Sequence, residues 1–246
     1  MVFRDIPYKR YTIEEGRSAF EKAEKAMKEA TSVHSVLAAK KIFDDAAIEY
    51  ATAVSLANCF TLDTRNEFYT KEVEYYDQVS PLFEELSVKF NDLLLTTPFR
   101  KELELHINKR ILQKAELSKK SFSPAVIEDC QKENALVTEY SKLMAGMTFL
   151  WQGKEIPLSA LRGELENGDR DVRRECAIAI GKGLKKHEKE LDDLYDRLVK
   201  IRTIIAHKLG YKSFTELGYY RMGRLDYDAT MVKAFRDNVQ KVLVPV

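Results

Sequence analysis

The stretch LDDLYDRLVKIRTIIAHKLG, residues 191–210, decides the fold class, because its apolar residues recur at the spacing of an α-helix. They step by three and four positions, which places them on one face of the helix: Leu191, Leu194, Leu198, Ile201, Ile205 and Leu209. Gly210 suits the left-handed residue that follows a helix. The stretch therefore predicts a long helix that packs one apolar face against its neighbours.

Similar stripes predict helices on both sides of this one. The stripe of residues 75–93 contains Pro81, whose missing backbone N–H predicts a bend near residues 77–80. Near the end, Asp228 is placed to cap a helix whose apolar positions are Val232, Phe235, Val239 and Val242. Ten Gly and six Pro are too few for a many-stranded protein. We predict a mainly α fold, a multi-helix antiparallel bundle.

One small β-hairpin is predicted near residues 147–158. MTFLW, residues 147–151, and EIPL, residues 155–158, are short apolar runs on either side of a turn at Gln152 and Gly153.

Three helix starts have the sequence of a capping box, in which a hydroxyl and a glutamate three residues later satisfy each other's backbone N–H groups. They begin at Thr12, Thr64 and Ser213. Each predicts a helix start at the following residue.

Composition excludes several classes of protein. The 246 residues include 40 Lys and Arg against 39 Asp and Glu, a net charge of +1, which argues against a general binder of nucleic acid or anionic membranes. No apolar run approaches the roughly 18 residues that span a bilayer, and the first residues contain no secretory signal. Cys59, Cys130 and Cys176 are sparse and odd in number, which predicts free thiols and a cytoplasmic location.

The residues alone predict no catalytic site and no metal site. The four histidines are His34, His106, His187 and His207, and no two stand four positions apart, as they do in a zinc-binding H-E-x-x-H helix. The nearest approach begins at His187, but Leu191 stands where the second histidine is needed. Gly181 and Gly183 lie inside a helical pattern and lack the strand that precedes a phosphate loop.

One segment has the composition of a binding surface. Residues 217–228 hold Tyr219, Tyr220, Arg221 and Arg224, and Tyr and Arg supply flat contact area and hydrogen-bond donors. The alternative is a corner between helices in which the tyrosine hydroxyls are satisfied locally. Both interpretations stay open at this point.

The same segment resembles a signature of the oligoendopeptidase F family, zinc metallopeptidases related to thimet oligopeptidase. The resemblance covers residues 205–211 and 214–229. Shorter matches follow in order along nearly the whole chain, at residues 62–69, 115–118, 122–124, 131–134, 139–143 and 169–173.

The resemblance implies a domain plan. Residues 1–112 correspond to an N-terminal helical region, residues 113–190 to the oligoendopeptidase N-terminal domain with its hairpin, and residues 191–246 to the first helices of a truncated peptidase domain. Family members place H-E-x-x-H and a third, glutamate ligand further on, so zinc is expected only in the complete enzyme. No catalytic residue and no metal ligand is carried over to this chain.

The resemblance also implies a function. The chain would form one wall of a channel in an enzyme that hydrolyses short peptides, with Tyr219, Tyr220, Arg221 and Arg224 lining or supporting it. The apolar residues 243–246 suggest a surface for a missing catalytic portion, or self-association. The alternative is a stand-alone helical scaffold or peptide-binding protein without activity. The length of the coding frame beyond Val246 distinguishes the two.

Overall fold

The computed structural model describes residues 6–63 and 66–246. Within them the protein is mainly α-helical, with one two-stranded sheet, as predicted. The helices of the first half are α1 (Ile13–Lys28), α2 (Val33–Phe60), α3 (Glu67–Thr96), α4 (Arg100–His106) and α5 (Lys109–Ser121). After a 3-10 turn, η2 (Pro124–Val126), the second half contains α6 (Ile127–Gly146), β1 (Thr148–Trp151), β2 (Lys154–Pro157), α7 (Leu158–Glu164), α8 (Arg170–Lys186), α9 (Glu188–Lys208), α10 (Phe214–Arg221) and α11 (Ala229–Val242).

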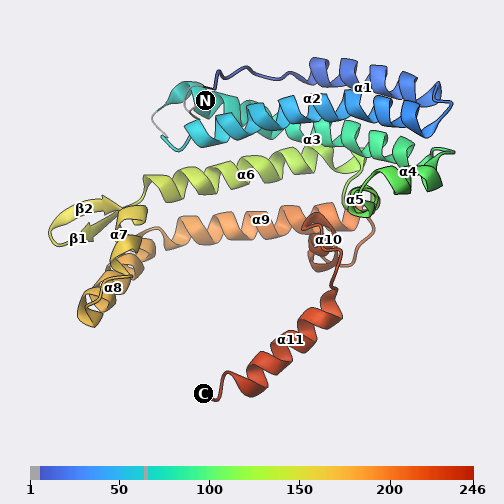
Figure 1. Ribbon diagram of the computed structural model, residues 1–246. Coiled ribbons are helices and arrows are strands. Elements are labelled where there is room, and N and C mark those ends of the chain that lie inside the picture. Colours follow the sequence, from blue (N-terminus) through green and yellow to red (C-terminus); the bar gives the residue numbers. More distant parts are fainter. Residues whose placement is uncertain (1–5, 64–65) are drawn as a thin grey trace.

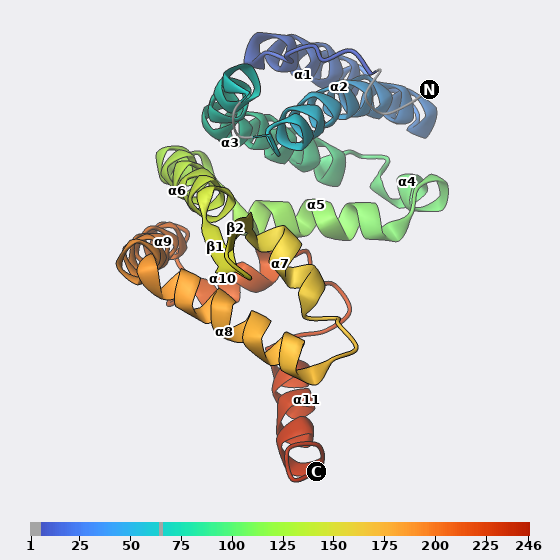
Figure 2. The same cartoon turned by 90° about the vertical axis from the view of Figure 1, so that its left-hand side faces the viewer.

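The long helices lie in layers (Figure 1). α1, α2 and α3 pack together on one side, α6 runs beneath them, and α9 runs beneath α6. The hairpin, α7 and α8 cluster at one end of α6 and α9, whereas α5 and α10 lie at the other. Figure 2 shows the same order from the side, with α11 pointing away from the other helices.

The first layer has an aromatic core between α2 and α3. The rings of Tyr50 and Phe83 stack with centroids 3.9 Å apart, and those of Phe43 and Phe90 stack at 4.6 Å. Aromatic rings in such contact add to the free energy that burial of their area provides. This core extends from Tyr11 to Leu112 along the chain.

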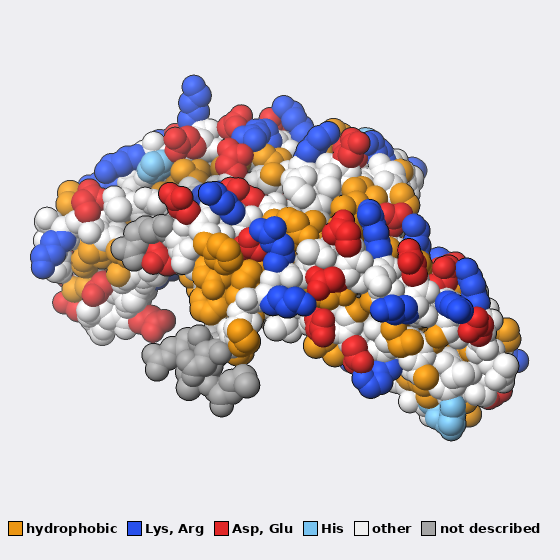
Figure 3. Space-filling view, turned by 90° about the horizontal axis from the view of Figure 1, so that it is seen from above, with side chains coloured by type: hydrophobic (Ala, Val, Ile, Leu, Met, Phe, Trp, Pro, Cys, Tyr) orange, Lys and Arg blue, Asp and Glu red, His pale blue; other side chains and the backbone are white. Residues whose placement is uncertain are grey.

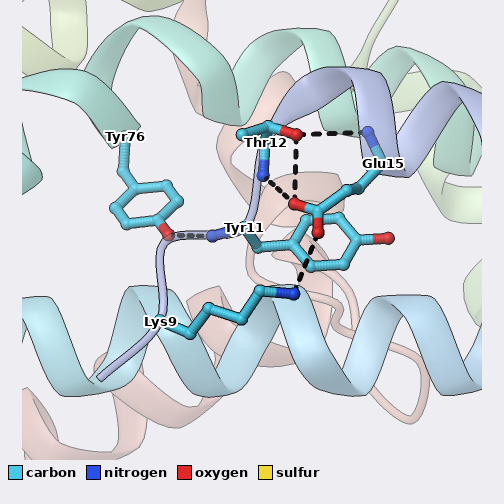
Figure 4. Close-up of polar contacts among 5 residues, drawn as sticks. All are labelled: Lys9, Tyr11, Thr12, Glu15 and Tyr76. Carbon is cyan, nitrogen blue, oxygen red and sulfur yellow. Dashed lines mark hydrogen bonds and ion pairs between the residues drawn. The ribbon is translucent and has the colours of Figure 1, made fainter. Parts of the chain in front are cut away.

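The capping box at Thr12 is confirmed (Figure 4). Glu15 accepts a hydrogen bond from the Thr12 backbone N–H at 2.8 Å, and the Glu15 N–H donates to the Thr12 hydroxyl at 3.2 Å. The ammonium of Lys9 lies 3.0 Å from Glu15. The Tyr76 hydroxyl accepts from the Tyr11 N–H at 3.0 Å, which ties this segment to α3.

The other two capping boxes were not confirmed. Thr64 lies outside the described residues. At Ser213 the prediction of a box is wrong: α10 begins at Phe214 as expected and the serine backbone is extended, but its side chain caps no backbone N–H. Asp228, by contrast, accepts from the Met231 N–H at 2.8 Å and caps α11 as predicted.

The predicted hairpin is confirmed. β1 pairs with β2 antiparallel, with Thr148 opposite Pro157 and Trp151 opposite Lys154. Gln152 and Gly153 both have positive φ, 47° and 78°, as the tightest hairpin turns require.

Below the hairpin, Phe149 is fully buried against α8 at Gly183. A Cβ at Gly183 would lie 2.2 Å from the Phe149 ring, so this crossing needs glycine. Gly181 and Gly183 are thus helical residues of α8 and form no phosphate loop.

The apolar stripe of α9 is buried as predicted. Leu194, Ile201 and Ile205 are buried, and they share a core with Cys130, Leu136 and Leu217 of α6 and α10. Gly210 follows α9 with φ of 85°. In α11, no residue is buried, and Phe235 is 68% exposed.

Candidate functional site

A proline inside α3 creates the first feature of the candidate site. Because Pro81 has no backbone N–H, the carbonyl of Asp77 one turn earlier lacks its helical donor. Asn134 of α6 donates to that carbonyl instead, with Nδ2 2.9 Å from the oxygen. Thr138 donates to the Asp77 carboxylate at 2.7 Å, and Gln131 donates to the carbonyl of Gln78 at 2.8 Å. We call these α3–α6 contacts the polar seam.

Other residues of α6 form ion pairs with α9. The carboxylates of Asp129 and Glu133 are buried, and their partners are Lys208 and Arg202. Further along, Arg197 of α9 donates two hydrogen bonds of 3.0 Å to Glu139. Ionised groups removed from water need such partners, so these pairs fix the register of the two antiparallel helices.

Glu133 has two arginine partners. Its Oε1 accepts from Nε of Arg202 at 2.8 Å, and its Oε2 lies 2.8 Å from Nη1 of Arg221. The second contact has the distance of an ion pair but misses hydrogen-bond geometry, so the buried Oε2 accepts no hydrogen bond. Both guanidinium groups also lie near the ring of Phe214, at 5.4 and 5.8 Å from its centroid.

A hollow of about 490 Å³ lies along the polar seam. We call it the α3–α6 groove. Its lining comes from the end of α2, from α3, from α6 and from Arg221: Val54, Asn58, Thr61, Leu62, Thr70, Val73, Tyr76, Asp77, Ser80, Glu133, Asn134, Val137, Thr138, Ser141, Lys142, Ala145 and Arg221. Ser80, Asn134 and Arg221 also line a second hollow of about 310 Å³, which reaches Glu84 and Cys130.

Burial changes the acidity of groups around the two hollows. Loss of water raises the pKa of Asp77, although the Thr138 hydroxyl and the charge of Lys142 counteract part of the increase. Burial likewise raises the pKa of Glu84, opposed by the charge of Arg221. Burial also raises the pKa of Cys130 to about 11, so this thiol stays protonated at neutral pH and is a poor nucleophile.

Comparison with known proteins shows similarity to peptidases of the M3 group and to oligoendopeptidase F. Residues 3–122 match the model of the Peptidase M3 N-terminal domain. No curated protein sequence matches the chain significantly. Among solved structures, PZ peptidase A with an inhibitor is 36% identical at a TM-score of 0.93, over 99% of this chain and 44% of the other. An oligoendopeptidase F structure is 37% identical at a TM-score of 0.93, over 100% and 44% of the two chains.

The chain is similar over its whole length to the N-terminal part of oligoendopeptidase F structures. An oligoendopeptidase F from Bacillus anthracis str. Ames is also similar, at 35% identity and a TM-score of 0.93, over 100% of this chain and 45% of the other. The chain thus spans less than half the length of these oligoendopeptidase F structures and corresponds to their N-terminal part. The division at residues 112 and 190 stays a prediction.

The oligoendopeptidase F signature segment does not form one surface. Arg221 reaches α6 and lines the α3–α6 groove. The next residue back, Tyr220, packs instead on Tyr211, with ring centroids 5.7 Å apart, and under the ammonium of Lys120 at 5.3 Å. Arg224 covers the ring of Tyr219 at 4.1 Å. Contact of these residues with a ligand stays a prediction.

The groove residues other than Arg221 were missed by sequence reasoning. Gln131 and Asn134 lie in one short stretch that resembles the oligoendopeptidase F family, and Pro81 marks the carbonyl that Asn134 contacts. The sequence signals for this contact were therefore the amide of Asn134 on one predicted helix and Pro81 inside another.

Residues 6–63 and 66–246 contain no group of three or more His, Cys, Asp and Glu side chains that could hold a metal ion. In the same ranges no helix is long and apolar enough to cross a membrane. On the face that Figure 3 shows, basic and acidic side chains alternate without a patch of one sign. The three cysteines are unpaired.

Proposed function

We propose that the chain forms the N-terminal, channel-lining part of a zinc-dependent oligoendopeptidase that hydrolyses short peptides. The supporting observation is the similarity over the full chain, at 36–37% identity and a TM-score of 0.93, to PZ peptidase A and an oligoendopeptidase F. Such similarity supports a shared fold and a peptidase parent.

The described residues do not fit zinc, because no group of potential ligands of the required size comes together in them. In the proposed enzyme, a C-terminal catalytic portion would supply the zinc ligands and the catalytic residues. In that enzyme, the helices of this chain contact the peptide and limit the size of the substrates that enter the channel.

The proposal also concerns the partners and location of the chain. The exposed apolar face of α11 would contact the catalytic portion, since Phe235 and Val242 are 68% and 56% exposed. Free thiols and the near-zero net charge support a cytoplasmic protein that binds neither nucleic acid nor membranes.

Two measurements test this function. The chain alone, supplied with zinc, should not cleave a fluorescence-quenched nonapeptide above background. The product of the complete coding frame should cleave it, and a chelator should abolish the cleavage. Chelator-sensitive turnover by the chain alone would contradict the assignment of the zinc site to a C-terminal catalytic portion. A complete frame without peptidase activity would contradict the function.

The α3–α6 groove favours a second candidate, a stand-alone peptide-binding protein without enzymatic activity. The intact mass of the natural protein separates the two. A mass near that of residues 1–246 would favour the stand-alone protein, whereas a mass about twice as large would favour the peptidase.

A further inference from the structure

The α3–α6 groove has the length of a short extended peptide. Its lining runs from Thr70 to Ser80 on α3 and from Glu133 to Ala145 on α6. At about 1.5 Å per residue these segments are roughly 15 and 18 Å long. An extended chain rises about 3.3 Å per residue, so the groove accommodates about five residues. Its volume of about 490 Å³ falls in the range of ligand sites.

The lining suits a peptide backbone. Uncharged polar side chains are spread along the groove. The hydroxyl protons of Thr61, Thr70 and Ser141 are donated within the chain, so their oxygens would serve as acceptors for peptide N–H groups, and Asn58 keeps one free amide N–H. Val54, Val73 and Val137 supply apolar surface between them.

The charges of the groove are balanced except near its centre. Lys142 is paired with Glu74 at 2.6 Å, and Arg221 with Glu133 at 2.8 Å. Asp77, half-buried between these pairs, accepts only the hydroxyl of Thr138, and no described Lys, Arg or His nitrogen forms an ion pair with it. The charge of Lys142 acts on Asp77 without forming an ion pair with it, so a ligand that brings a cation into contact would stabilise this half-buried carboxylate.

We propose that the α3–α6 groove binds an extended peptide segment of about five residues whose central side chain is basic and pairs with Asp77. The inference rests on the proposed function, because it names the class of peptide that this part of the enzyme holds. It concerns binding by this chain and requires no catalytic step.

The first test compares two blocked pentapeptides in titration calorimetry at low salt. One is acetyl-Ala-Ala-Lys-Ala-Ala-amide, and the other has norleucine, which lacks the ammonium, in place of lysine. The lysine peptide should bind about tenfold more tightly, as expected for about 1.4 kcal/mol from one charged contact. Asp77→Asn keeps the shape of the side chain and should abolish this difference while the norleucine peptide binds as before.

The second test locates the binding. Val137→Trp should fill the groove and weaken both peptides at least tenfold. Ile111→Trp is the matched control, because Val137 and Ile111 are 42% and 40% exposed on helices but Ile111 lines a different hollow. Circular dichroism of each variant verifies that the helices are retained.

Several outcomes would overturn the groove proposal: no binding of the lysine peptide at millimolar concentration, equal affinity for both peptides, or equal effects of the two tryptophan variants. If the complete coding frame still hydrolyses peptides in that case, the proposed function stands and only the groove proposal fails. If the pentapeptides behave as expected but the product of the complete coding frame is inactive, the groove proposal stands and the proposed function fails.

Discussion

Asn134 of α6 donates its side-chain amide to the backbone carbonyl of Asp77 on α3, at 2.9 Å. In an uninterrupted helix that carbonyl would accept from the residue four positions later, which here is Pro81. Pro81 would weaken an isolated helix, but here it frees the Asp77 carbonyl, which then accepts the hydrogen bond that joins α3 to α6.

Asn134→Ala should lower the free energy of unfolding by about 1–3 kcal/mol, because the Asp77 carbonyl then has neither donor. In a Pro81→Ala background the backbone N–H of residue 81 can donate to it, so the same change should cost about 1 kcal/mol less. Urea denaturation of the four proteins in this double-mutant cycle measures the difference. An identical loss in both backgrounds would show that the two residues are not coupled.

Asp77 should make stability depend on pH. Its raised pKa means that the folded state holds the proton more tightly than the unfolded state. The free energy of unfolding should therefore fall as pH rises from the ordinary aspartate value, about 3.9, through the raised folded value. Asp77→Asn removes this decrease, so the variant gains stability relative to the wild type between acid and neutral pH.

Denaturation at pH values from 3 to 8 tests that effect. The charged groups around Asp77 are Glu74 of α3 and Lys142 of α6, with Glu133 and Arg221 along the same groove. These groups are present in both the wild type and Asp77→Asn, as is Glu84, whose pKa is also raised by burial. The difference between the two curves therefore isolates Asp77, and parallel curves would refute the assignment.

Gly183→Ala should destabilise the protein by about 1–3 kcal/mol, since its Cβ would overlap the buried ring of Phe149. Gly181→Ala is the matched control on the same helix, where nothing lies within 4 Å of the added Cβ. That change should stabilise α8 by about 0.5–1 kcal/mol, because alanine favours the helix. Thermal melts should show a lower melting temperature for Gly183→Ala and a higher one for Gly181→Ala. Shifts of the same sign would contradict the close packing of Phe149 on Gly183.

The apolar face of α11 should cause the isolated chain to self-associate at tens of micromolar. Sedimentation velocity should show species heavier than the monomer, and Phe235→Gln should reduce them by removing the largest exposed apolar side chain of this helix. Lys241→Gln, on the polar face of the same helix, should leave the distribution unchanged. A monomer at all concentrations would contradict this expectation.

The fold could be predicted from the sequence where the signal is local. The stripe of α9 gave the helix and its buried face, because residues three and four apart share a face whatever lies opposite. The hairpin followed from the turn at Gln152 and Gly153. The capping box at Ser213 failed because a serine at a helix start need not turn its hydroxyl towards the backbone N–H groups.

The groove could not be predicted in the same way. Asp77 and Asn134 are far apart in the sequence, and only the packing of α3 on α6 brings them together. The directions of the side chains in the Tyr/Arg segment could not be predicted for a related reason. Successive residues of a helix diverge by about 100°, so Tyr220 and Arg221 of α10 face different helices.

The polar seam has a consequence for how the chain folds. The aromatic core of the first helices ends at Leu112, and the core shared by α6, α9 and α10 begins at Phe122. Across α3 and α6 the two are joined by hydrogen bonds of amides and hydroxyls, and Val88 of α3 packs on the second core. Apolar burial, the main source of cooperativity, is thus largely confined within each core. We therefore expect the helices from α6 onward to open locally while the first core remains native, which native-state hydrogen exchange would detect as lower protection beyond residue 122.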